Sequence, residues 1–183
     1  MDKSFKIKRF IIELISVVIL TSVDRYTKGL AVSRLKDRDA LELIKGWLEL
    51  YYLPNGNTGA AFGMLKGHQV LFCIIALAVC IVLFILLYNM PPDRRFIILD
   101  ILLVFIIAGG FGNMYDRLMQ GYVVDFIYIS RINFPIFNVA YIYVSCSTFL
   151  LAVLLLFYYK EEDIKLIESA IKAALKKDRD GQD

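Results

Sequence analysis

One segment of the chain limits its possible folds more than any other feature. Residues 70 to 88 read VLFCIIALAVCIVLFILLY, a run of 19 residues without a charged side chain. As a helix rising about 1.5 Å per residue, this run roughly matches the thickness of a bilayer's hydrocarbon core, about 30 Å. Hydrophobic residues make up 58% of the 183-residue chain, above the roughly 45 to 50% of a soluble domain. The run therefore predicts a transmembrane helix.

Three further segments have the composition of membrane spans: residues 10 to 28, 96 to 115 and 141 to 159. The last of these is uncharged and ends in two tyrosines followed by Lys160, as is typical at a membrane interface. The other two contain ionisable groups, Glu13 and Asp24 in the first and Asp100 in the second. Glu13 and Asp100 fit either snorkelling toward the cytoplasmic surface or a contact between helices. We therefore predict an all-α membrane protein with four transmembrane helices.

The distribution of basic residues predicts the orientation of these spans. Four spans place both termini on the same side of the membrane. Of the 21 Lys and Arg residues, 12 lie in the two terminal tails and in the loop 89–95, so the positive-inside rule favours cytoplasmic termini. We predict one transmembrane domain over residues 1–160 and a cytoplasmic tail over residues 161–183. In the tail, apolar residues share one face of an amphipathic helix suited to the inner membrane surface: Ile164, Ile167, Ile171, Ala174 and Leu175.

The segment between the first two spans is mixed in character. Leu48 to Phe62 reads LELYYLPNGNTGAAF, with alternation and aromatic residues before Pro54 and a Gly/Asn turn after it, which predicts strand and turn. Leu30 to Trp47 mixes charged and apolar positions, and we predict a short interfacial helix there. Both stretches are expected outside the membrane, on the side opposite the termini.

The composition disfavours several classes of function. The formal net charge is +3 without a dense basic block, so membrane lipid rather than nucleic acid is the expected partner. The three cysteines lie inside apolar runs and His68 is the single histidine, so we predict no disulfide, no metal site and no cofactor. A small transporter or proton channel is disfavoured because the chain lacks internal repeats and broken helices.

Charged residues near the span ends are functional candidates, because placing a charge at membrane depth costs about 2.5 to 3.5 kcal/mol. These candidates are Asp24, Asp116, Arg117 and Asp125. A structural reading also exists, in which Asp116 pairs with the adjacent Arg117 and Asp24 pairs with Lys28 at i, i+4 spacing. Asp125 differs, since it lies between apolar neighbours in VVDFI, and we predict a raised pKa for its carboxyl.

Five short motifs follow one another along the chain: DRYTK from Asp24, NTGAAF from Asn57, GGFGNMYDR from Gly109, VVDFI from Val123 and FNVA from Phe137. Each motif alone is weak. Together, in this order and with the predicted spans between them, they resemble the motifs of signal peptidase II, the prolipoprotein signal peptidase family. The resemblance implies a four-helix intramembrane aspartic endopeptidase with a small extracytoplasmic β-cradle and an interfacial helix.

The resemblance also implies a substrate, a location and site residues. The substrate is a diacylglyceryl-modified prolipoprotein, cut just before its lipidated cysteine in the bacterial cytoplasmic membrane, and we expect the protein to be a monomer. One catalytic aspartate of the family belongs to the Val-Val-Asp motif, which Asp125 matches. The other directly follows Phe-Asn-Val-Ala, where this chain has Tyr141. Further motif positions are predicted to bind substrate or support the site: Asp24, Lys28, Asn57, Gly59, Asn113, Asp116, Arg117 and Asn138.

The tyrosine at position 141 affects the predicted mechanism. An aspartic dyad works because two neighbouring carboxyls share one proton, so that one acts as base while the other donates. A phenol with a pKa near 10 can donate a hydrogen bond but cannot exchange these roles. The last span contains no Asp or Glu, and Asp116 matches a family position that looks structural. We therefore predict a signal peptidase II fold with absent or very low peptidase activity.

Two alternatives to this hypothesis stay open. In the first, the protein is a working prolipoprotein signal peptidase whose site is completed by an unrecognised carboxylate. In the second, it is a non-enzymatic lipopeptide-binding or chaperone-like membrane protein that uses Asp125, Asn57 and Asn138 as polar contacts. Cleavage of a lipidated substrate distinguishes the first alternative, and binding without cleavage favours the second.

Overall fold

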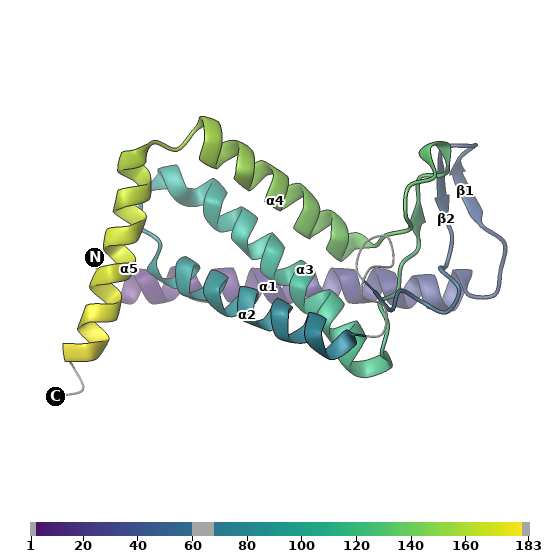
Figure 1. The fold of residues 1–183 in the computed structure, drawn as a ribbon, viewed down its shortest axis with the longest axis horizontal. Helices are drawn as coiled ribbons and strands as arrows, with labels where there is room; N and C mark the ends of the chain where they lie inside the picture. The colour runs from purple at the N-terminus through teal and green to yellow at the C-terminus, as the bar shows by residue number, and fades with distance from the viewer. Residues whose placement is uncertain (1–2, 60–67, 181–183) are drawn as a thin grey trace.

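The structure, a computed structural model, describes residues 3–59 and 68–180 (Figure 1). The described part is mostly helical and contains five α-helices: α1 (Lys3–Leu35), α2 (Gln69–Asn89), α3 (Ile97–Gln120), α4 (Val139–Phe157) and α5 (Glu161–Asp180). Two 3-10 helices, Arg94–Phe96 and Ser130–Ile132, and three short strands accompany them. The strands lie at one end of the helical bundle, and both termini lie toward the other end (Figure 1).

Helix α3 lies at the centre of the bundle and packs against α1, α2 and α4. Its side chains supply much of the core, and Leu103, Ile107 and Ala108 are almost completely buried. The outer faces of α2 and α4 are apolar and exposed, as Ile74 and Leu156 illustrate. Helices that are apolar on all faces are typical of spans surrounded by lipid.

Within the described residues, three helical stretches are long and apolar enough to cross a membrane: Gln69–Asn89, Arg94–Gln120 and Val139–Phe157. They coincide closely with three of the four predicted spans, although α3 continues beyond residue 115 to Gln120. The remaining predicted span, residues 10–28, lies within α1. Because α1 carries several charged residues, among them Glu13 and Asp24, it is not one of the three stretches that are apolar enough to cross a membrane by composition alone.

The three strands form one antiparallel sheet of order β1, β2, β3 beyond the end of α1. Their bounds are Leu41–Ile44 for β1, Leu48–Leu50 for β2 and Ile127–Tyr128 for β3. Phe137 is linked to Ile127 by an isolated bridge, so the chain entering α4 borders the same sheet. The strand predicted after Trp47 is confirmed by β2, and the last residues of that predicted segment, 60–62, lie outside the described part.

The interfacial helix predicted within Leu30–Trp47 is wrong. Instead, α1 continues to Leu35, because Ala31 and Leu35 pack in a second apolar cluster that includes Val124. The chain then forms β1 and turns into β2 through Gly46, whose φ of +67° is a conformation that glycine adopts at little cost. The mixed charged and apolar pattern belongs to a helix end followed by a hairpin.

Two glycines let α3 approach its neighbours closely. A Cβ atom at Gly109 would lie 2.6 Å from the backbone oxygen of Ala140 in α4. A Cβ atom at Gly112 would collide with the carboxylate of Asp24 in α1. The glycines of this motif therefore allow the polar residues of α1, α3 and α4 to meet.

The tail after α4 forms α5, which crosses the end of the bundle (Figure 1). Asp163 in its first turn accepts a hydrogen bond from Lys160 N at 2.8 Å and pairs with Arg95 at 2.8 Å. These contacts cap α5 and attach it to the segment before α3. On the predicted apolar face, Ile167 packs against the core, whereas the side chains at 174 and 175 lie outside the described part.

Candidate active site

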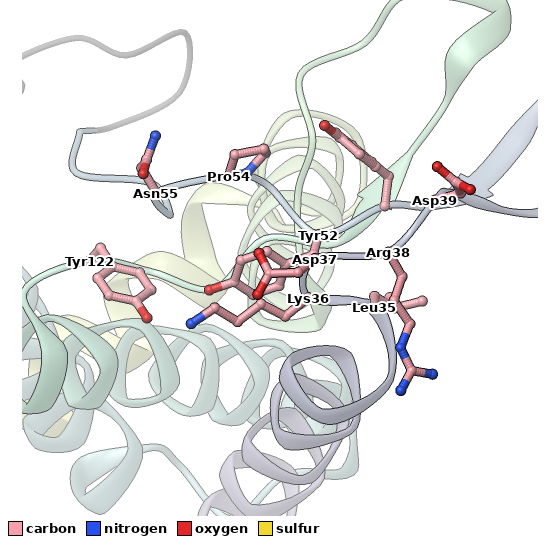
Figure 2. A pocket seen from close by; sticks show the side chains of 10 residues that line it. Leu35, Lys36, Asp37, Arg38, Asp39, Tyr52, Pro54, Asn55 and Tyr122 are labelled. Atoms are coloured by element: carbon pink, nitrogen blue, oxygen red, sulfur yellow. The ribbon is translucent and has the colours of Figure 1, made fainter.

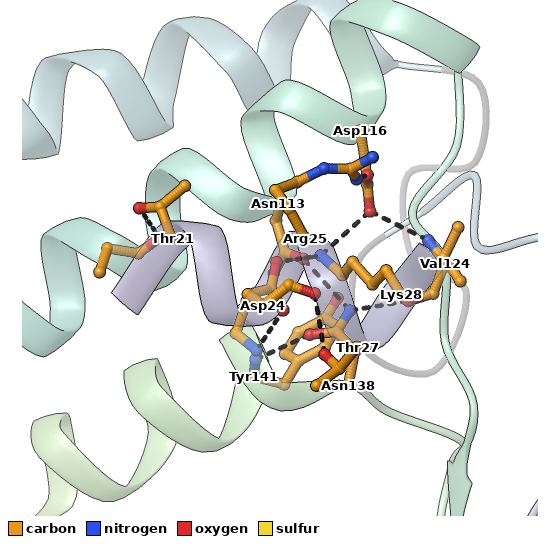
Figure 3. Close-up of polar contacts among 12 residues, drawn as sticks. Thr21, Asp24, Arg25, Thr27, Lys28, Asn113, Asp116, Val124, Asn138 and Tyr141 are labelled. Carbon is orange, nitrogen blue, oxygen red and sulfur yellow. Dashed lines mark hydrogen bonds and ion pairs between the residues drawn. The ribbon is translucent and has the colours of Figure 1, made fainter. Parts of the chain in front are cut away.

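The ammonium of Lys28 is the centre of a buried polar cluster between α1 and α3 (Figure 3). Its Nζ lies 2.8 Å from Asp24 Oδ2 and 3.0 Å from Asp116 Oδ2, and donates to Asn113 Oδ1 at 2.9 Å. Lys28 and both carboxylates are at most 1% exposed. The predicted pair of Asp24 with Lys28 is therefore confirmed, and burial makes each charge dependent on its partners.

The predicted ion pair between Asp116 and Arg117 is wrong. Neighbouring residues of a helix do not face each other. Asp116 points into the bundle, where it pairs with Arg25 of α1 and accepts a hydrogen bond from Val124 N at 3.2 Å. Arg117 donates instead to the backbone oxygen of Gly59 at 3.0 Å. Asp116 therefore holds helices and loop together, and its carboxyl is fully engaged.

The first turn of α4 is attached to the same cluster. Asp24 Oδ1 accepts a hydrogen bond from Ala140 N at 2.9 Å, and Asn138 Oδ1 accepts one from Tyr141 N at 2.9 Å. Asn138 is the N-cap residue of α4 and has an extended backbone. Because both contacts satisfy free N–H groups of the first turn, they fix the position of residue 141 through the backbone.

The carboxyl of Asp125 lies beside this cluster, in the segment between α3 and β3. Its Oδ1 accepts a hydrogen bond from Asn138 Nδ2 at 2.6 Å, and its Oδ2 accepts one from Asn57 Nδ2 at 2.8 Å. The residue is 1% exposed. Burial raises the pKa of Asp125 to about 6, against the opposing effect of the two amides and of the charges on Lys28 and Arg117. The predicted rise in pKa is confirmed.

The two amides are themselves held in place. Asn57 and Val123 exchange backbone hydrogen bonds of 2.9 Å, and Asn57 Oδ1 accepts one from Gly59 N at 2.9 Å. Asn138 Nδ2 also lies 3.2 Å from Asn113 Oδ1. Since each amide oxygen is used as an acceptor, both NH₂ groups are directed at the carboxyl between them.

Tyr141 faces the same space from the first turn of α4. Its phenol lies in the electrostatic surroundings of Arg117, Asn57 and the Asp125 carboxylate. In the part of the chain that the structure describes, both hydrogen-bond partners of the Asp125 carboxyl are amides. The undescribed segment 60–67 contains no acidic residue. The site therefore combines one carboxyl, two amides, a guanidinium and a phenol.

All ten predicted site residues belong to this connected network, and the structure adds one that sequence reasoning missed. Arg25 reaches Asp116 from α1, and its guanidinium lies 4.4 Å from the ring centroid of Tyr115. Arg25 lies three residues before Lys28, on a neighbouring face of the same helix, and this spacing could have indicated that it belongs to the same site. Among the described residues, no group of three or more His, Cys, Asp or Glu side chains could hold a metal ion.

A separate polar pocket of about 560 Å³ opens beside β2 (Figure 2). Charged residues after α1 and aromatic residues line it, among them Lys36, Asp37, Asp39, Tyr51, Tyr52 and Tyr122. Burial raises the pKa of Tyr52 to about 12, and Tyr122 acts in the same direction. Neither Asp125 nor Tyr141 belongs to this lining, so the pocket is distinct from the carboxyl site.

The Asp125 carboxyl is expected to titrate near pH 6. Infrared spectroscopy measures this midpoint from the carboxylic acid band that is present in the unaltered protein and absent in the Asp125→Asn variant. Between about pH 4 and 6 the folded protein then binds a proton that the unfolded chain has released, so folding stability falls as pH rises through this window. Asn57→Ala should raise the midpoint, because its amide stabilises the carboxylate. Asn133→Ala, remote from this carboxyl, should not. A midpoint near pH 4 would contradict the assignment.

The fold and the site define a class: a helical membrane protein with a buried carboxyl site where its apolar helices meet a small sheet. The model of the family described as Signal peptidase (SPase) II matches residues 16–157. The chain therefore belongs to the signal peptidase II family, as its five motifs predicted.

Individual relatives agree with this family. The lipoprotein signal peptidase of Clostridium novyi (strain NT) is 36% identical over 147 residues, which cover 79% of this chain and 97% of the relative. That of Clostridium tetani (strain Massachusetts / E88) is 38% identical over 158 residues, covering 84% and 98%. A solved structure titled "Bacterial membrane enzyme structure by the in meso method at 2.3 A resolution" is also similar, with a TM-score of 0.69 and 29% identity over 81% of this chain and 92% of that one.

Proposed function

We propose that this protein binds the lipid-modified signal peptide of a prolipoprotein in the manner of signal peptidase II, with peptidase activity that is absent or very low. One observation supports the proposal: among the described residues, the hydrogen-bond partners of the Asp125 carboxyl are amides, and Tyr141, at the motif position of the family's second aspartate, lies near that carboxyl. The family's activity is cleavage before the lipidated cysteine. That step needs a pair of carboxyls around one water.

The roles of the site residues follow from their contacts. Asp125 is the remaining acid, oriented by the amides of Asn57 and Asn138. A protonated Asp125 can donate a hydrogen bond to a peptide carbonyl, and its raised pKa supports this form below about pH 6. Tyr141 and Arg117 can also donate, so the site can hold a peptide group. A second group able to accept the proton of an attacking water is missing among the described contacts of Asp125.

The remaining predicted residues serve as supports. Lys28 and its carboxylate partners fix α1 against α3, and Asn113 joins them to the amide of Asn138. Gly59 holds the guanidinium of Arg117 through its backbone oxygen. We infer that these groups keep the peptide-binding side chains in place without touching the scissile bond.

Purified protein in detergent, incubated with a diacylated prolipoprotein, tests the proposal. We expect the lipidated substrate to bind and to remain uncut, whereas an unlipidated version should bind more weakly. The matched positive control is a lipoprotein signal peptidase with both aspartates. Clear turnover by the unaltered chain would refute the inactive-site hypothesis.

A second candidate, an active prolipoprotein signal peptidase, is favoured by one observation. The lipoprotein signal peptidases that resemble the chain match it over 97% and 98% of their length. In that case another proton acceptor would have to complete the site. The same assay separates the candidates, and loss of turnover in Asp125→Asn would show that the activity arises at this site.

We also propose that α1 is a fourth span and that both termini are cytoplasmic. Residues 1–160 then form a single domain, and residues 161–183 form a tail on the inner membrane surface. The internal pairing of Asp24 with Lys28 supports this, since it shields both charges from lipid. Exposed apolar residues on α1 such as Ile12 and Val18 are also consistent with lipid contact. Reporter fusions at the two ends test the orientation, and sedimentation in detergent tests the expected monomer.

A further inference from the structure

A groove of about 440 Å³ runs between α1 and α3, toward the end of the bundle that carries the termini. Its walls are mainly apolar, and two acidic residues line it, Glu13 from α1 and Asp100 from the first turn of α3. In Figure 1 this end lies opposite the strands, so the groove is remote from the Asp125 site. The proposed function gives these two carboxyls no role.

The Glu13 side chain is buried and incompletely paired. It is 8% exposed, and Oε1 lies 3.3 Å from Arg9 Nε, a contact without hydrogen-bond geometry. Within the described residues, three buried carboxylate oxygens have no hydrogen-bond partner: Oε1 and Oε2 of Glu13, and Oδ1 of Asp100. A buried carboxylate that lacks donors costs roughly 2 to 4 kcal/mol at membrane depth on insertion scales, so such a group either takes up a proton or pairs with a cation or a donor.

The cation that lines the groove, Arg9, makes most of its hydrogen bonds with backbone oxygens rather than with the two carboxyls. Nη2 of Arg9 donates to backbone oxygens at the end of α2, at 3.0 Å to Leu87 and 2.9 Å to Met90, and Nη1 donates to the backbone oxygen of Pro91 at 3.4 Å. Only its Nε faces Glu13. Among the lining residues, one guanidinium therefore opposes two carboxyls, so ionisation of both carboxyls leaves one negative charge to be balanced.

The groove's walls indicate that the balancing cation has an alkyl body. Ile12, Ile19, Ile97 and Ile101 line the groove, and each is about half exposed or more. Their side chains suit an acyl chain lying along α1 and α3. Asp100 lies in the first turn of α3, which follows Arg94 and Arg95 in the chain, and basic residues of this kind are typical of the membrane interface where lipid headgroups lie.

We propose that this groove binds a membrane lipid whose headgroup carries a primary ammonium. The ammonium supplies one positive charge and three N–H donors, which match the surplus charge and the open oxygens of Glu13 and Asp100. The acyl chain covers the isoleucines. A quaternary ammonium has the same charge but no N–H, so headgroups of that kind bind more weakly.

Native mass spectrometry of the full chain tests this proposal. The protein is released from bilayers that contain equal amounts of phosphatidylethanolamine and phosphatidylcholine with identical acyl chains. We expect the ethanolamine lipid to be retained about tenfold more, the ratio that one charge-assisted hydrogen bond supplies. In the variant Glu13→Gln with Asp100→Asn the ratio should fall to near one. Glu168→Gln, an exposed carboxyl on α5, is the matched control and should keep the preference.

Three results would overturn the proposal: equal retention of the two lipids, a preference that survives in the double variant, or preferential retention of anionic phosphatidylglycerol when it is added to the bilayers in equal amount. Competition by a lysine-bearing membrane helix, without any lipid preference, would assign the groove to a protein partner instead. Circular dichroism checks that the variants fold. If the double variant does not fold, Asp100→Asn alone should still lower the ratio at least severalfold.

Discussion

Replacing Tyr141 with aspartate is expected to raise cleavage of a diacylated prolipoprotein by about 10² to 10⁴-fold, the usual contribution of a positioned acid or base. The backbone at this position is held by Asn138 and Asp24, whose carboxyl and amide oxygens bind N–H groups of the first turn of α4. These contacts do not depend on the side chain at 141. A new carboxyl would therefore project into the space beside Asp125, where two carboxyls can share a proton.

Controls separate the carboxyl from the loss of the phenol ring. Tyr141→Asn has nearly the same size as the aspartate variant but cannot act as a base, so it should stay as inactive as the unaltered chain. Adding Asp125→Asn to the aspartate variant should remove the gained activity. If Tyr141→Asp cleaves no faster than Tyr141→Asn, the absence of a second carboxyl is not what limits this protein.

The spans and the local pairs could be predicted because their causes are close together in sequence. The uncharged run at 70–88 becomes α2, and the run at 141–159 becomes α4 with ends shifted by two residues. The pair of Asp24 with Lys28 follows from helix geometry alone. The placement of Tyr141 beside Asp125 was predicted through the motif resemblance, which relates segments that spacing alone cannot bring together.

The wrong predictions concern contacts between distant segments. Arg25 and Asp116 are separated by 91 positions, so nothing in the sequence around Asp116 identifies the true partner, whereas Arg117 is an obvious neighbour. The end of α1 is likewise set by packing of Leu35 in a cluster with Val124. Local propensity does not contain this information, because helix ends depend on which apolar surface the last turn can bury.

Removing the charge of Lys28 is expected to be the most destabilising single change in the described network. Lys28→Met keeps the length of the side chain but leaves Asp24 buried without its cation, and Asp116 with Arg25 alone. Breaking a buried pair from one side typically costs about 3 to 5 kcal/mol. Thermal unfolding in detergent should show a large decrease, or the variant should fail to accumulate in the membrane.

Comparison with an exposed ion pair shows whether the loss of stability in Lys28→Met comes from burial of the charges or from the loss of an ion pair alone. Lys165→Met removes an exposed i, i+4 pair with Glu161 and should cost at most about 1 kcal/mol. Adding Asp24→Asn to Lys28→Met should recover part of the loss, because the uncompensated carboxylate is then neutral. If Lys28→Met and Lys165→Met unfold alike, the charges near Lys28 must be hydrated, and the polar cluster cannot be the rigid support on which the positions of Asp125 and Tyr141 depend.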